Sequence, residues 1–262
     1  MKSMLEESGA GKIENSETAV SQFDPRLLLA ALGAFSLGYI ILPALSAFTG
    51  FLMKGNPAGT VCSGMIGVVG PLASVAAVFI LVKSYSGSFR ETLQALGFKH
   101  FPVRMLWYAF PLALAIMIAG GGVTLLWSTL AELCNIQFGV PPTVAAALSR
   151  DSWLVTALLV TALLAAPVFE EIFFRRALFD ALRYFLPGWA AVILASLAFA
   201  AMHMSLLQLP GLWLMGALWQ KIYLKNGTLY SSVILHFFNN VIAVIMLLIV
   251  RCMGLEATIL SL

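Results

Sequence analysis

Long apolar stretches without a charged residue recur along this chain, and four of them precede Glu170. They cover residues 27–52, 61–82, 105–130 and 153–169, and a helix of roughly 20 apolar residues is what crosses a hydrocarbon core about 30 Å thick. Of the 262 residues, 61% are hydrophobic and only 10% are charged, and the mean hydropathy is +0.95. Because a water-soluble domain carries roughly 25% charged residues, the chain belongs in a lipid bilayer.

The apolar segments predict an all-α membrane protein, a polytopic bundle of about seven transmembrane helices. The predicted spans are Leu27–Leu52, Val61–Val82, Met105–Leu130, Trp153–Leu182, Trp189–Ser205, Gly211–Tyr223 and Leu229–Val250. Dividing the long fourth segment would give eight spans. The chain then has a polar N-terminal tail over 1–26, membrane helices and linkers over 27–150, a membrane core over 151–252 and a short C-terminal tail over 253–262.

Basic residues are distributed unevenly between the two ends of these spans. With the N-terminus in the cytoplasm, cytoplasmic segments hold all the lysines and arginines except Lys54, Arg150 and Arg251. Such an excess of basic residues is typical of the cytoplasmic side. We therefore expect a multi-pass protein of the cell membrane with a cytoplasmic N-terminus.

Two linkers also have predicted structures. The basic linker from Ser84 to Arg104 is amphipathic, so Leu93, Leu96 and Phe98 are expected to lie on the membrane surface. The outer linker before the fourth span is expected to contain one short helix.

Several kinds of site are excluded by the pattern of residues. Cys62, Cys134 and Cys252 lie far apart and lack the spacing of a thiolate metal site or a redox motif. The sequence contains no Gly-rich phosphate loop and no basic, aromatic patch suited to nucleic acid. The expected partners are therefore the bilayer and a membrane-associated molecule.

Few ionisable side chains lie inside the apolar segments. Glu170 and Glu171 are carboxylates placed deep within one, and His203 and His236 are imidazoles within two others. Such groups are costly in lipid and commonly mark functional sites. A single buried histidine is more often structural, because buried polar groups usually find partners. The presence of several groups in one chain favours function.

These groups form three pairs, each spaced by four residues on a different predicted helix. The pairs are Glu171 with Arg175, Phe199 with His203, and His236 with Asn240. Residues four apart share one helix face, so Arg175 can neutralise Glu171. Glu170 then projects about 100° away around the same helix.

The depth of Glu170 in the membrane depends on where the fourth helix ends. If that helix continues to about Tyr184, Glu170 lies near its centre and level with His236. Pro167 removes one backbone hydrogen bond and is expected to kink the helix. The sequence thus predicts a long, kinked helix and a polar cavity lined by Glu170.

At these residues the chain resembles the CPBP intramembrane proteases, also called the Abi or CAAX protease and bacteriocin-processing family. The signature of that family is EExxxR, then FxxxH, then HxxxN. The corresponding segments here are EEIFFR, FAAMH and HFFNN, in the same order, and the resemblance covers roughly Trp153 to Val250.

The resemblance implies hydrolysis of a peptide bond in a lipidated CAAX-type protein or another membrane-associated protein or peptide. It implies that Glu170 is the general base, that His203 assists it, and that His236 and Asn240 stabilise the oxyanion. Arg175 would hold Glu171 and so orient the helix, and Phe199 completes the second motif. The chemistry agrees, because amide hydrolysis needs an activated water and donors for the oxyanion.

The need for a metal is left open by the residues. Glu170, His203 and His236 could supply three ligands to a catalytic zinc. The chain has no HExxH motif, however, and a glutamate with an oxyanion hole can hydrolyse a peptide without metal. We prefer the mechanism that requires no cofactor.

Two other functions remain compatible with the polar groups. Buried Glu, His and Arg also serve proton relays in transporters, although no inverted repeat is evident here. A non-catalytic membrane scaffold could retain the motifs as architecture. A transport flux across proteoliposomes that survives Glu170→Gln would support the transporter. Partner binding that survives Glu170→Ala would support the scaffold.

Overall fold

The computed structural model describes residues 24–54, 56–149 and 152–260. Every regular element within these ranges is a helix, which confirms the all-α class. The predicted N-terminal tail lies outside the described residues up to position 23. Its last two residues, Pro25 and Arg26, already belong to the first helix, which begins at Pro25 after the N-cap residue Asp24.

The chain before residue 150 contains two long antiparallel helical segments and a third long helix. The first segment consists of α2 (Pro25–Phe35), the π-helical segment η1 (Ser36–Ile41) and α3 (Leu42–Leu52). The elements that follow are α4 (Pro57–Ser86), α5 (Phe89–Ala95), the short 3₁₀ turn η2 (Val103–Met105), α6 (Leu106–Leu133) and α7 (Pro142–Ala147). The short helix predicted in the outer linker is thus present as α7.

The second part of the chain opens with one uninterrupted helical segment. It consists of α8 (Ser152–Val160), the π-helical segment η3 (Thr161–Ala165), α9 (Ala166–Glu170), the π-helical segment η4 (Glu171–Leu178) and α10 (Phe179–Phe185). The remaining elements are α11 (Gly188–Met202), α12 (Leu209–Asn226), α13 (Tyr230–Cys252) and α14 (Glu256–Leu260).

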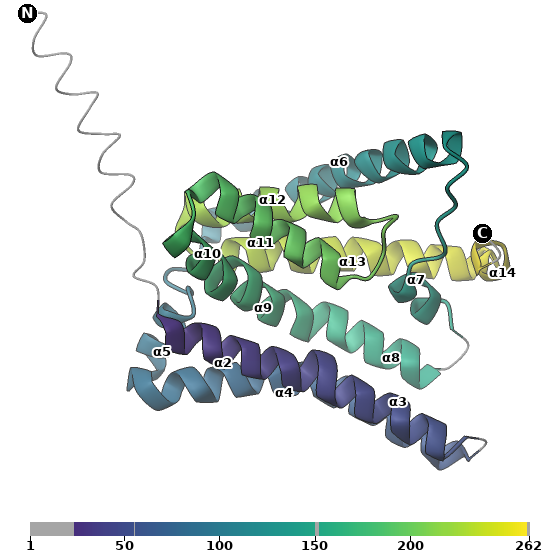
Figure 1. Cartoon of the computed structure of the whole chain (residues 1–262), viewed down its shortest axis with the longest axis horizontal. Helices are drawn as coiled ribbons and strands as arrows, with labels where there is room; N and C mark the ends of the chain where they lie inside the picture. The colour runs from purple at the N-terminus through teal and green to yellow at the C-terminus, as the bar shows by residue number, and fades with distance from the viewer. Residues whose placement is uncertain (1–23, 55, 150–151, 261–262) are drawn as a thin grey trace, which may run out of the picture.

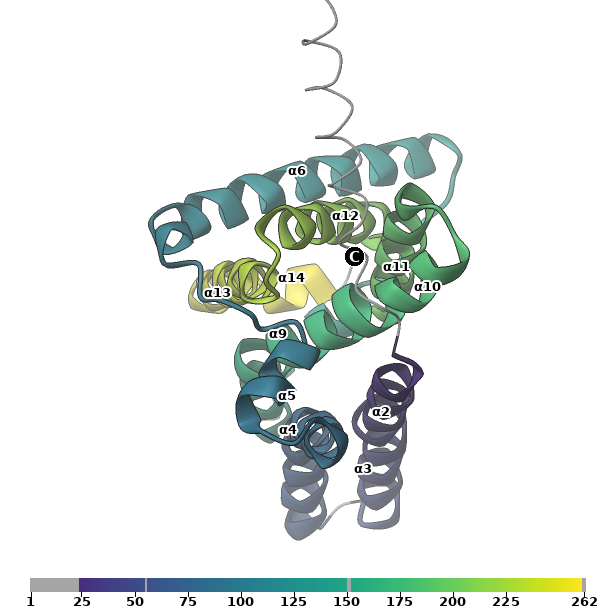
Figure 2. The same ribbon diagram turned by 90° about the vertical axis from the view of Figure 1, so that its left-hand side faces the viewer.

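The helices lie alongside one another between two ends of the bundle. The start of α2 lies with α5 and α10 at one end, whereas α7 and α14 lie at the other (Figure 1). Viewed from the first end, α2, α3 and α4 form one group, and α6, α11, α12 and α13 form another (Figure 2). The segment from Ser152 to Phe185 contacts both groups, because η4 packs on α2 while α9 packs on α4 and α13.

Four helices are long and apolar enough to cross a membrane, judged by length and composition. They are Pro25–Leu52, Val69–Ser86, Val103–Leu133 and Tyr230–Cys252, and Gly188–Met202 is a shorter apolar helix. Large apolar side chains such as Trp107 and Ile80 project outward from them. The chain is therefore a multi-pass membrane protein with four candidate spans in the described residues, and the predicted number of seven to eight stays a prediction.

The predicted long fourth helix is confirmed. Helical structure continues without a break from Ser152 to Phe185, so Glu170 lies near its middle. The π-helical segment η3 ends two residues before Pro167, and the kink expected at this proline stays a prediction. A π-helical segment inside an α-helix is frequent at functional sites.

The linker after α4 was predicted wrongly in one respect. Leu96 and Phe98 lie in the hydrophobic core instead of on the membrane surface, and Leu93 is partly buried against that core. Gly97 has a φ of +94° and turns the chain back, which lets its carbonyl accept a hydrogen bond of 2.9 Å from the Leu229 amide. The linker is thereby fastened to the start of α13.

Candidate active site

Glu171 and Arg175 form the ion pair that their spacing predicts. Glu171 Oε2 lies 3.1 Å from Arg175 Nε, and both side chains are fully buried. The guanidinium carbon lies 4.4 Å from the centre of the Phe199 ring and 5.7 Å from that of Trp219. The faces of aromatic rings attract cations, so the charge is stabilised by a carboxylate and by two rings.

His236 lies between the two carboxylates of the first motif. Its Nδ1 atom is hydrogen-bonded to Glu171 Oε1 at 3.0 Å, and its Nε2 atom lies 3.9 Å from Glu170 Oε2. The Trp219 ring stacks on the imidazole with a centroid separation of 4.7 Å. Glu171 and Trp219 thus fix the plane of the ring and direct Nε2 toward Glu170.

Glu170 is buried but less fully engaged than its neighbour. Tyr39 of η1 donates a hydrogen bond of 3.3 Å to Oε1, and Oε2 has no hydrogen-bond partner among the described residues. Glu171 is occupied by Arg175 and His236, as described above. Glu170 is therefore the less closely paired carboxylate, because its Oε2 has only the 3.9 Å ion pair with His236 where Glu171 Oε2 lies 3.1 Å from Arg175.

His203 is placed differently from the expectation that it lies inside a helix. The helix α11 ends at Met202, and His203 is its C-terminal cap residue, followed by Met204 in the left-handed region with a φ of 53°. The fifth span is therefore shorter than predicted. His203 Nδ1 is hydrogen-bonded to the Phe199 carbonyl at 3.0 Å, an interaction that itself closes the end of the helix.

The ring of Phe199 lies between the two histidines. Its centroid is 5.0 Å from that of His203 and 6.0 Å from that of His236, both edge to face. None of the described contacts joins His203 directly to Glu170. The structure therefore relates His203 to the charged cluster through the aromatic ring.

Asn240 lies one turn after His236 on α13 and faces the π-helical segment η3. Its Nδ2 group donates a hydrogen bond of 2.7 Å to the carbonyl of Ala162. That contact uses one of its two N–H groups. Asn240 makes no described contact with Glu170.

The described contacts thus bring four of the seven predicted site residues into one cluster, namely Glu170, Glu171, Arg175 and His236. Phe199 packs against this cluster, and His203 and Asn240 adjoin it through Phe199 and η3. Among the described residues, no three His, Cys, Asp or Glu side chains are placed to hold a metal ion. The catalytic roles of these residues and the need for zinc stay predictions.

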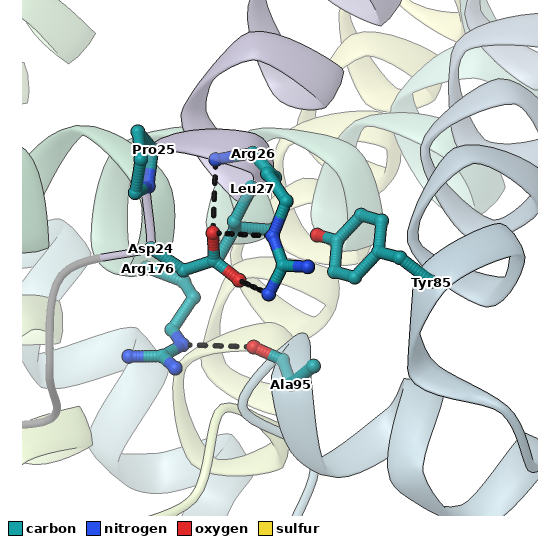
Figure 3. A pocket seen from close by; sticks show the side chains of 7 residues that line it. All are labelled: Asp24, Pro25, Arg26, Leu27, Tyr85, Ala95 and Arg176. Carbon is teal, nitrogen blue, oxygen red and sulfur yellow. Dashed lines mark hydrogen bonds and ion pairs between the residues drawn. The ribbon is translucent and has the colours of Figure 1, made fainter.

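A pocket of about 520 Å³ lies at the end of the bundle where α2 begins. It is lined by Asp24, Pro25, Arg26, Leu27, Tyr85, Ala95 and Arg176, and so contains none of the predicted site residues (Figure 3). Hydrogen bonds from Arg26 hold the pKa of the Asp24 carboxyl below its ordinary value. The predicted polar cavity beside Glu170 is a separate feature and remains a prediction.

Sequence reasoning missed three residues that support the cluster. Tyr39 contacts Glu170, Trp219 stacks on His236, and Gln220 Nε2 donates to the backbone carbonyl of Arg175 at 3.4 Å. Gln220 is a buried polar group in an apolar segment, a signal that could have drawn attention to α12. Nothing in the spacing of Tyr39 or Trp219 indicates which helix each one faces.

Comparison with known protein families identifies the region that carries this cluster. The family model described as "Type II CAAX prenyl endopeptidase Rce1-like" matches residues 152–242. Residues 152–242, which this family model matches, are named the Rce1-like domain after it. This Rce1-like domain contains all seven predicted site residues, and the match confirms the resemblance to the CAAX protease family. No curated protein and no solved structure matches the chain.

Proposed function

We propose that this protein is an intramembrane endopeptidase that hydrolyses a peptide bond in a lipidated CAAX-type protein or another membrane-associated protein or peptide. The single observation that carries the proposal is the buried pair of Glu170 and His236 inside the Rce1-like domain. An isolated carboxylate is costly in such surroundings. Activation of water would account for a buried carboxylate oxygen that faces a histidine and makes no described hydrogen bond.

The distance between Glu170 and His236 suits a bridging water. At 3.9 Å, Glu170 Oε2 and His236 Nε2 are too far apart for a direct hydrogen bond. They are close enough for one water molecule to contact both. In the proposed mechanism, Glu170 accepts a proton from this water, and the water oxygen attacks the carbonyl carbon of the substrate.

The remaining steps follow from amide chemistry. Attack of the water forms a tetrahedral oxyanion, the C–N bond then breaks, and the proton taken by Glu170 passes to the leaving amine. His236 and Asn240 would donate hydrogen bonds to the oxyanion, and His203 would help to hold the water. For Asn240, the donor would be the N–H group that is not bonded to Ala162.

The hydrogen bond to Glu171 sets a condition on the role of His236. If Nδ1–H donates to Glu171, a neutral ring has no proton on Nε2 and cannot donate to an oxyanion there. Donation from Nε2 therefore requires the doubly protonated ring.

The proposal includes a topology of seven spans with a cytoplasmic N-terminus. Successive long helices run lengthwise along the bundle (Figure 1), and α12, with 18 residues, is about 27 Å long. The excess of basic residues at the end where α2 begins supports the orientation. Glu170 would then lie deep in the membrane, where substrate and water must both reach it.

The proposed mechanism requires no cofactor. A zinc ion held by Glu170, His203 and His236 is the alternative, and it would act by polarising the carbonyl and the attacking water. The choice between the two is made by experiment, because the same residues would be essential in either mechanism.

The proposed function is tested by mass spectrometry of products from prenylated and non-prenylated peptides incubated with the purified full-length protein. The wild type is compared with Glu170→Gln, with and without a metal chelator. Glu132→Gln serves as the control, because Glu132 is an exposed carboxylate at the end of α6. Loss of a general base costs on the order of 10²–10⁴ in rate.

We expect cleavage by the wild type and by Glu132→Gln, little cleavage by Glu170→Gln, and no effect of the chelator. Loss of wild-type activity on chelation, with recovery on adding zinc, would replace the cofactor-free mechanism by the metal-dependent one. Full cleavage by Glu170→Gln would refute the role of Glu170. A protein that cleaves none of the peptides, while remaining folded, would refute the proposed activity on CAAX-type sequences.

A further inference from the structure

Tyr39 is the one tyrosine among the described contacts that reaches a carboxylate of the cluster. Its hydroxyl donates a hydrogen bond of 3.3 Å to Glu170 Oε1 across 131 positions of sequence. Tyr39 belongs to the first helical segment, and thus lies outside the Rce1-like domain over 152–242. A residue of the N-terminal part of the chain therefore touches the proposed general base.

Aromatic stacking fixes the position of the Tyr39 ring. The ring is parallel to Phe35 with a centroid separation of 5.2 Å and stacks on Phe169 at 5.4 Å. Phe35 in turn stacks on Phe173 at 4.8 Å. Since Phe169 and Phe173 flank Glu170 on the long helix, the stack aligns the tyrosine with the carboxylate.

The backbone around Tyr39 is also held closely. At the adjacent Gly38, an added Cβ would overlap Ser74 Oγ and lie 2.7 Å from the Gly70 carbonyl oxygen, so this crossing with α4 requires glycine. Ser74 Oγ donates a hydrogen bond of 2.8 Å to the Ala34 carbonyl. The π-helical segment η1 changes the direction in which residues after Phe35 project. These contacts set the rotation of the helix and hence the side on which Tyr39 lies.

We propose that Tyr39 is a positioning residue that orients the Glu170 carboxylate, so that the N-terminal helix completes the catalytic site. This inference rests on the proposed role of Glu170. A donor at Oε1 restrains the carboxylate, and Oε2 is then left facing His236 Nε2. The other charged or titratable groups around Glu170 are its neighbour Glu171, Arg175 and His236.

The first test is the measurement of kcat and KM for Tyr39→Phe in the purified full-length protein. Phenylalanine keeps the ring stack and removes only the hydroxyl. Without this donor the Glu170 carboxylate is no longer held toward His236, which should affect the chemical step more than substrate binding. We expect kcat to fall about tenfold with little change in KM, the size expected for a hydrogen bond to a charged group.

Tyr85→Phe is the matched control, since Tyr85 lies on α4 beside the pocket of Figure 3 and stacks under Arg26. It should leave kcat and KM unchanged. A kcat that stayed at the wild-type value in Tyr39→Phe would overturn the positioning role, even if thermal stability fell. That combination would mean that the hydroxyl serves only the fold.

A second measurement does not depend on activity. Thermal unfolding of the wild type, Tyr39→Phe, Glu170→Gln and the double variant forms a cycle that reports the coupling between the two side chains. We expect the shifts in unfolding temperature to be non-additive. Additive shifts would overturn the contact and with it the positioning role. If the shifts are non-additive but the protein cleaves no peptide, the contact between Tyr39 and Glu170 is supported and the proposed function is refuted.

Discussion

Glu171 Oε1 lies 3.0 Å from His236 Nδ1, although the two residues are 65 positions apart in the sequence. The other oxygen of the same carboxylate lies 3.1 Å from Arg175 Nε. One buried carboxylate thus joins η4 to α13 and sets the orientation of an imidazole beside Glu170. The second glutamate of the motif is therefore part of the framework on which the proposed chemistry depends.

Glu171→Gln is expected to lower the free energy of unfolding by about 3–5 kcal/mol, because it leaves the Arg175 guanidinium buried without its counter-charge. The measurement is chemical or thermal unfolding of the purified protein in detergent. Glu132→Gln, at an exposed site, should change stability by no more than about 0.5 kcal/mol. Equal losses in the two variants would contradict the structural importance of the buried pair.

Gly38→Ala is expected to destabilise the crossing between η1 and α4 by about 1–3 kcal/mol, the cost of forcing extra volume into a packed interface. Gly33→Ala on the same helical segment is the control, because a Cβ there meets nothing within 4 Å. Replacing that glycine in a helix should leave stability unchanged or raise it by up to about 1 kcal/mol. The free energy of unfolding is measured for both variants. Equal changes in Gly38→Ala and Gly33→Ala would contradict the close crossing.

The features that could be predicted from the sequence follow from periodicity along single helices. Apolar runs indicated the membrane helices, and a spacing of four residues indicated the ion pair of Glu171 with Arg175. The requirement that Glu170 lie at the depth of His236 predicted a long helix to about Tyr184, and the helix in the structure ends at Phe185. Each inference needed only the geometry of one helix, or the thickness of a bilayer.

Contacts between helices could not be predicted from the periodicity of single helices. A helical pattern shows which residues share a face, but it does not show which other helix that face meets. The Tyr39 contact with Glu170, the Trp219 stack on His236 and the burial of Leu96 all depend on tertiary packing. The end of α11 before His203 was missed because the apolar sequence continues beyond it, while the backbone turns at Met204.

The start of α5 provides a prediction for pH dependence. The Ser88 amide donates a hydrogen bond of 2.8 Å to Glu91 Oε2, and this hydrogen bond lowers the pKa of the Glu91 carboxyl from 4.5. The folded state thus favours the charged form, so the stabilisation is present at neutral pH and is lost as the pH falls below 4.5. The difference in unfolding temperature between wild type and Glu91→Gln should accordingly shrink between pH 7 and pH 3.

Ser88→Ala is the control for this titration. Ser88 Oγ accepts a hydrogen bond of 3.2 Å from the Glu91 amide, which does not depend on the ionisation of the carboxyl. Its loss should cost about 1 kcal/mol at both ends of the pH range, as for other N-cap residues. A Glu91→Gln difference that stayed constant from neutral to acid pH would contradict the assignment.

Asn240 offers a way to separate support of the π-helical segment from stabilisation of the oxyanion. Asn240→Ala removes the donor to the Ala162 carbonyl, which should cost about 1–3 kcal/mol of stability. If its second N–H also binds the oxyanion, kcat should fall on the order of 10²–10³ with little change in KM. Asn239→Ala is the neighbouring comparison, since among the described contacts Asn239 donates to Asn240 Oδ1 at 3.3 Å and not to η3, so it removes a contact of Asn240 while leaving both N–H groups of that side chain in place. Unfolding and steady-state kinetics are measured on both variants. If Asn240→Ala loses stability but retains kcat, Asn240 holds η3 in place and does not stabilise the oxyanion.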